Sequence, residues 1–196
     1  MIRLRPDVRA ACCAGGVAAL LFGALSSVAA AEDAIAAGYW AMLERAAHRG
    51  LMQEVAAAGG RPAPFATDGC SGGLSAIWRQ FSGREETADG PPFEACCVAH
   101  DLLYHDADGI GSSGRILDGR DEDLATASQQ ARLAADQALR RCVETQLSSR
   151  ESPTAAIAAP VATAIYAAVR FGGAPCSGLS WRWGYGYGHC QAVFGR

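Results

Sequence analysis

Lysine is absent from this chain of 196 residues, so all 17 basic residues are arginines. Together with abundant alanine, this is typical of a GC-rich bacterial genome. Basic residues do not outnumber acidic ones either, since the formal net charge is −3 at pH 7. No basic stripe of the kind that binds nucleic acid is present, so no nucleic-acid partner is expected.

The sequence also lacks paired CxxC or CxxH motifs, which argues against zinc as the reason for its cysteines. It has no internal repeat and no clear second domain. Half of the residues are hydrophobic (50%), enough for a packed core. We therefore expect one domain, over residues 32–196.

The first 31 residues are predicted to be a signal peptide. Three arginines in "MIRLRPDVR" precede an apolar run from Ala10 to Ala31, and small residues near Ala30 offer a cleavage site. The run is long enough that an uncleaved membrane anchor is the alternative. Export is the expectation, either by secretion or into a periplasm.

Hydrophobic periodicity predicts a mainly helical fold. Four helices are expected, over residues 33–58, from Pro91-Pro92 to about Asp106, over roughly Asp121–Leu147, and from Ser152-Pro153 to Phe171. Pro160 should kink or divide the last of these. The glycine-rich, aromatic tail is expected to be irregular, and its rings could face lipid or cover the core. These rings are Trp181, Trp183, Tyr185 and Tyr187.

An even number of cysteines follows the predicted signal peptide, which in an exported chain indicates three disulfide bonds. They are Cys70, Cys96, Cys97, Cys142, Cys176 and Cys190. Their spacing alone leaves the pairing open.

One stripe of the second helix combines apolar and chemically active side chains, because its members recur at helical spacing. They are Phe93, Cys97, His100, Asp101 and Tyr104. Buried polar groups need partners, and Asp136 on the third helix is a candidate. If Cys96 or Cys97 is bonded to Cys142, Asp136 comes near His100 and Tyr104. An imidazole held by a carboxylate at one nitrogen can take a proton from water at the other.

Three segments carry a resemblance to a known family. They are "CCVAHDLLY" (residues 96–104), "DGCSGG" (68–73) and "ADQALRRCV" (135–143). The first resembles the active-site helix of the secreted phospholipases A2, with its pattern Cys-Cys-x-x-His-Asp-x-Cys-Tyr. The second resembles the glycine-rich calcium loop of that family, and the third resembles its third-helix segment. The match covers residues 68–143, in the right order.

The resemblance implies a Ca²⁺-dependent hydrolase that cleaves the sn-2 ester of phospholipids at a membrane surface. His100 would be the general base, Asp136 would orient it, and Tyr104 would hydrogen-bond Asp136. Ca²⁺ would be bound by the Asp101 carboxylate and by loop carbonyls, because calcium prefers oxygen ligands. The carbonyls are those of Gly69, Ser71 and Gly73.

The implied fold is an antiparallel, disulfide-linked helix pair with a calcium-binding loop. To this the sequence pattern of the rest of the chain adds an N-terminal helix and a C-terminal helical and aromatic extension. The implied disulfide pairs are Cys70–Cys97, Cys96–Cys142 and Cys176–Cys190. Two departures occur together: Leu103 and Ala135 stand where the family has the two cysteines of a further bond.

Other interpretations compete with this one. His100-Asp101 could be a structural pair in a core helix, and the chain could be a non-catalytic module that binds lipid or protein. A metal-dependent hydrolase could use His100, Asp101, His105 and Asp106, but His100 and His105 diverge by about 140° on a helix. His105 is expected on the surface. No role is expected for His48 or His189.

Overall fold

The computed structural model describes residues 38–70, 73–82, 91–107, 122–148 and 154–190. The chain divides after Met42 into two units. Only residues 38–42 of the first unit are described; they are helical, and the rings of Tyr39 and Trp40 meet with centroids 6.2 Å apart. The predicted signal peptide lies outside the described residues. All contacts reported below lie within the second unit, Leu43–Arg196.

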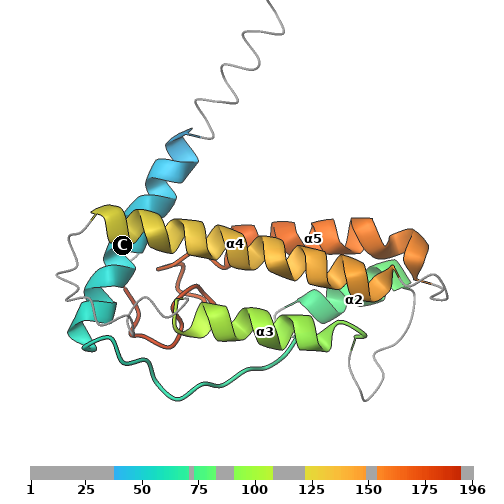
Figure 1. Cartoon of the computed structure of the whole chain (residues 1–196), viewed down its shortest axis with the longest axis horizontal. Coiled ribbons are helices and arrows are strands. Elements are labelled where there is room, and N and C mark those ends of the chain that lie inside the picture. Colours follow the sequence, from blue (N-terminus) through green and yellow to red (C-terminus); the bar gives the residue numbers. More distant parts are fainter. Residues whose placement is uncertain (1–37, 71–72, 83–90, 108–121, 149–153, 191–196) are drawn as a thin grey trace, which may run out of the picture. The chain divides into compact units, whose positions relative to one another are not determined.

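The described part of the chain is mainly helical and contains no strand, which confirms the predicted helical class. The helical residues 38–57 are followed by α2 (Leu74–Ser82), α3 (Glu94–His105), α4 (Glu122–Leu147), the 3-10 helix η2 (Ala155–Ile157) and α5 (Ala158–Gly172). Figure 1 shows α3, α4 and α5 running alongside one another, with α4 in contact with both of the others.

Helices α3 and α4 are antiparallel. The disulfide Cys96–Cys142 joins the first turn of α3 to the C-terminal part of α4. Further along α3, Tyr104 meets Arg132, which lies ten residues earlier on α4 than Cys142. Cys70–Cys97 ties the loop before α2 to α3, and Cys176–Cys190 closes the C-terminal segment. These are the three pairs that the resemblance implied.

The described residues form two buried apolar clusters. One lies among α2, α3, α4 and α5, where the rings of Trp78 and Phe93 meet edge-on with centroids 5.6 Å apart. The other packs Leu51 and Met52 of the N-terminal helix against Trp183. Trp183 is fully buried and Tyr187 nearly so, hence these two rings of the aromatic tail cover the core. Trp181 and Tyr185 are only partly buried.

The prediction that His105 lies on the surface is wrong, because only 4% of this residue is exposed. The C-terminal segment covers it: Gly186 N donates a hydrogen bond to the His105 carbonyl at 2.8 Å. Its ring packs edge-on against Phe65 and Tyr185, with centroids 5.4 and 5.1 Å away. The end of α3 is therefore enclosed by chain that follows it by some eighty residues.

Three prolines occupy positions that differ from those expected. Pro160 is the third residue of α5, and the change from 3-10 to α-helix occurs before it, between Ile157 and Ala158, so Pro160 lies in the first turn of the α-helix. In a first turn the missing N–H of proline costs no helical hydrogen bond. Helix α3 begins at Glu94, so Pro91 and Pro92 precede it rather than fill its first turn.

Candidate active site

The centre of the site is a buried pair of side chains from the two disulfide-linked helices. His100 Nε2 lies 2.9 Å from Asp136 Oδ1, and Asp136 is fully buried. The expected approach of Asp136 to His100 is thereby confirmed. Because an ionised carboxylate only accepts hydrogen bonds, the proton of a neutral His100 ring is on Nε2. The lone pair of the ring is then on Nδ1.

Tyr104 supports the same carboxylate, as expected. Its hydroxyl donates to Asp136 Oδ1 at 2.6 Å, and its ring lies against His100 with centroids 4.1 Å apart. Burial raises the pKa of Tyr104, so the phenol is a donor at any physiological pH. A side chain at Gly173 would meet the Tyr104 hydroxyl at 2.7 Å, so only glycine leaves room for it there.

Two arginines reach the site from positions that the sequence did not mark. Arg170 Nη1 donates to Asp136 Oδ2 at 2.8 Å, and Arg132 Nε donates to the Tyr104 hydroxyl at 3.1 Å. Both arginines also bind Glu44, through Arg132 Nη1 at 2.5 Å and Arg170 Nη2 at 2.8 Å. Two carboxylates and two guanidinium groups therefore form one network around the candidate base.

This network keeps its carboxylates ionised. Burial acts to raise the pKa of Asp136, but the hydrogen bond with His100 and the charge of Arg132 outweigh it and hold this pKa below its usual value. For Glu44, burial is again outweighed, by its contact with His48 and by the two arginines, so its pKa is also lowered.

His48, for which no role was expected, belongs to this buried region. Its Nδ1 lies 2.8 Å from Ser128 Oγ, and its Nε2 lies 3.7 Å from Glu44 Oε1. Trp183 Nε1 donates to the same Ser128 hydroxyl at 3.0 Å. Burial lowers the pKa of His48, so it is neutral near pH 7. Both His48 and Ser128 are fully buried, and we assign them a packing role.

The loop that resembles a calcium loop lies beside α3, between Glu94 and Asp101. Thr67 Oγ1 donates to Asp101 Oδ2 at 2.5 Å, and the Glu94 carboxylate accepts from Cys70 N at 3.3 Å. Gly69 has φ +65°, and a side chain there would collide with the Glu94 carboxylate. The left-handed backbone at Gly69 thus favours glycine where the loop passes α3. Ser71, an expected ligand, lies outside the described residues.

The oxygen atoms at this loop suit a hard cation. Burial raises the pKa of Asp101, and the charges of Asp68 and Glu94 raise it further, while the Thr67 hydrogen bond lowers it. Carboxylates that repel one another beside backbone carbonyls are the donor set that Ca²⁺ prefers. No three His, Cys, Asp or Glu side chains in the described ranges form a metal-binding group, so carbonyl ligands would be needed as well.

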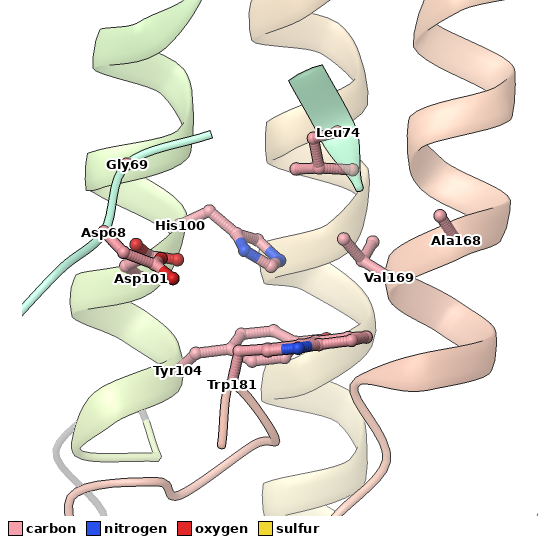
Figure 2. A pocket seen from close by; sticks show the side chains of 9 residues that line it. All are labelled: Asp68, Gly69, Leu74, His100, Asp101, Tyr104, Ala168, Val169 and Trp181. Atoms are coloured by element: carbon pink, nitrogen blue, oxygen red, sulfur yellow. The ribbon is translucent and has the colours of Figure 1, made fainter. Parts of the chain in front are cut away.

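A pocket joins this loop to the candidate base (Figure 2). The carboxylates of Asp68 and Asp101 lie next to Gly69 on one side of the His100 ring, while Leu74, Ala168 and Val169 form an apolar wall on the other. The rings of Tyr104 and Trp181 lie across one end. A reacting group in this pocket would therefore meet the base, the acidic loop and an apolar surface together.

The metal-hydrolase interpretation is not supported by the way its residues are arranged. His100 bonds to Asp136, whereas His105 packs between the rings of Phe65 and Tyr185. His105 Nε2 is buried without a hydrogen-bond partner in the described structure. The two histidines therefore face different surroundings, as their angular separation predicted.

Comparison of the chain with models of known families, with curated proteins and with solved structures finds no match.

Proposed function

We propose that this protein is an exported, Ca²⁺-dependent hydrolase of the phospholipase A2 type, which releases the sn-2 fatty acid of a glycerophospholipid. The observation that carries the proposal is the His100–Asp136 pair, because its His100 lines the same pocket as Asp101 and Gly69. The three segments on which the family resemblance rests supply these four residues. The antiparallel, disulfide-linked pair α3 and α4 supports the same family fold.

In this proposal, His100 takes a proton from water at Nδ1 as the water attacks the ester carbon. Asp136 stabilises the imidazolium that forms, since it is ionised and 2.9 Å from Nε2. Tyr104 fixes the same oxygen of Asp136 by its hydrogen bond. His100 then returns the proton to the leaving lysophospholipid oxygen, so the protein is regenerated.

Calcium would be held by the Asp101 carboxylate and the carbonyls of Gly69, Ser71 and Gly73, and when bound it supplies a positive charge for the ester carbonyl oxygen. The apolar wall of Leu74, Ala168 and Val169 suits the acyl chain of a substrate presented at a membrane surface. Three disulfide bonds suit an oxidising compartment outside the cytoplasm, as expected for an exported chain.

The test is fatty-acid release from vesicles of mixed anionic and zwitterionic phospholipids. We expect release by the exported, fully disulfide-bonded protein in calcium, and none when a chelator removes the calcium. Magnesium in place of calcium should not restore release, because its small octahedral shell does not suit a loop of carbonyl ligands. No release in calcium from folded protein would favour a non-catalytic binding module or a different ester substrate.

A further inference from the structure

Asp136 offers two carboxylate oxygens, and the candidate base uses only one of them. His100 and Tyr104 both bond to Oδ1. Oδ2 accepts from Arg170 Nη1 at 2.8 Å, and Arg132 Nε lies 3.9 Å from it. The orientation of the carboxylate is therefore set by donors on both of its oxygens.

Arg170 is itself held in place by Glu44. Its Nη2 donates to both oxygens of Glu44, at 2.9 and 2.8 Å, while its Nη1 donates to Asp136. A guanidinium group can do this because its donors form a rigid planar fork. Arg132 completes the network by bonding Glu44 and the carbonyls of Val169 and Arg170 at the end of α5. The N-terminal helix, α4 and α5 thus join α3 in fixing the position of one carboxylate.

We propose that Arg170, anchored by Glu44, is a positioning residue for the candidate base. It holds the plane of the Asp136 carboxylate, which in turn keeps the His100 ring with Nε2–H toward Asp136 and Nδ1 available to the pocket. Neither Glu44 nor Arg170 lies within residues 68–143, so the family resemblance implies no role for either. The catalytic consequence rests on the proposed function, but the effect on the His100 ring does not.

The experiment compares variants of Arg170 with a matched arginine variant. Arg170→Met removes the donor, and Arg170→Lys keeps the charge without the fork. The double variant Glu44→Gln/Arg170→Met removes opposite charges together. It therefore keeps the charge of the buried network balanced, in case Arg170→Met alone fails to fold. Arg141→Met is the control, because Arg141 is exposed on α4.

Two readouts are needed. The first is kcat and KM for calcium-dependent fatty-acid release from vesicles. The second is the ¹⁵N spectrum of the histidine ring nitrogens, recorded in every variant at one pH above the titration range of histidine. The His100 signals are assigned as those that vanish in His100→Gln. This spectrum reports the tautomer of His100 and requires no activity.

We expect Arg170→Met to lower kcat by roughly 10- to 100-fold with little change in KM, as is typical when a supporting hydrogen bond to a functional group is lost. Arg170→Lys should recover part of this loss, because it keeps the positive charge. Recovery should be incomplete, because an ammonium group is a point charge that cannot bind both carboxylates as the guanidinium fork does. The His100 ring should change from the single Nε2–H tautomer to a mixture in Arg170→Met and in the double variant, but not in Arg141→Met.

A folded double variant with wild-type kcat and an unchanged His100 spectrum would overturn this role for Arg170. If the wild-type protein releases no fatty acid, the proposed function fails, and the spectrum alone then decides the positioning role. An altered His100 tautomer in that case would still support it, whereas an unaltered one would refute it.

Discussion

Replacing His100 with glutamine is expected to reduce calcium-dependent fatty-acid release by about a thousandfold, within the range that a general base contributes. Glutamine can still donate a hydrogen bond to Asp136, but it has no basic nitrogen to take a proton from water. The buried network around Asp136 stays intact in this variant. Initial rates of release from vesicles, measured beside the circular dichroism spectrum and the Tm, separate lost chemistry from lost folding.

The matched control is His189→Gln, the same chemical change at an exposed histidine. It should retain full activity. We expect both variants to melt close to the wild-type temperature and to differ only in the rate of fatty-acid release. If His100→Gln kept more than about a tenth of the activity, well above what loss of a general base leaves, another group would have to be the base.

Replacing Arg132 with methionine is expected to cause the largest loss of stability among single changes at the site. Arg132 is 1% exposed and donates to the Tyr104 hydroxyl, to Glu44 and to two carbonyls of α5. Without it, Arg170 is the one arginine among the described residues that still pairs with the partly buried Glu44. Breaking a buried ion pair in this way typically costs about 3–5 kcal/mol of unfolding free energy.

Urea unfolding followed by circular dichroism, with the disulfide bonds intact, measures this loss. Arg141→Met is again the control, because it makes the same change at an exposed position of the same helix. It should shift the unfolding free energy by no more than about 0.5 kcal/mol. Equal effects of the two substitutions would show that the Arg132 network contributes little to the fold.

Much of the site could be predicted because its main signals are local. Helical spacing places His100, Asp101 and Tyr104 on one face of α3, and the structure confirms that they line one pocket. Predicting the contact with Asp136 required one long-range assumption, a disulfide bond between the start of α3 and the C-terminal part of α4. The Cys96–Cys142 bond supplies it.

The arginine network could not be predicted, because nothing local distinguishes its members. Arg132 lies four residues before Asp136, the spacing of an ordinary surface ion pair, and α4 carries exposed arginines as well. Arg170 and Glu44 are 126 residues apart and meet only because their helices pack together. A charged side chain that is buried by tertiary packing leaves no hydrophobic periodicity to detect.

The prediction that His105 lies on the surface was also wrong because tertiary packing buries this residue without leaving a local signal in the sequence. Its helical angle does place it away from His100. That side of α3 is covered by the C-terminal segment, where Gly184 N and Gly186 N bond to the carbonyls of Tyr104 and His105. The glycine-rich, aromatic sequence of this segment predicts an irregular tail. Only the folded chain shows that the segment covers the end of α3.

The most direct test of the central claim is the identity of the fatty acid released from a phospholipid that carries different acyl chains at sn-1 and sn-2. Mass spectrometry of the products, with calcium or with a chelator, reports position and metal dependence together. The account predicts release of the sn-2 chain alone, and only in calcium. Release of the sn-1 chain, release that persists in chelator, or no release by folded and fully disulfide-bonded protein would contradict it.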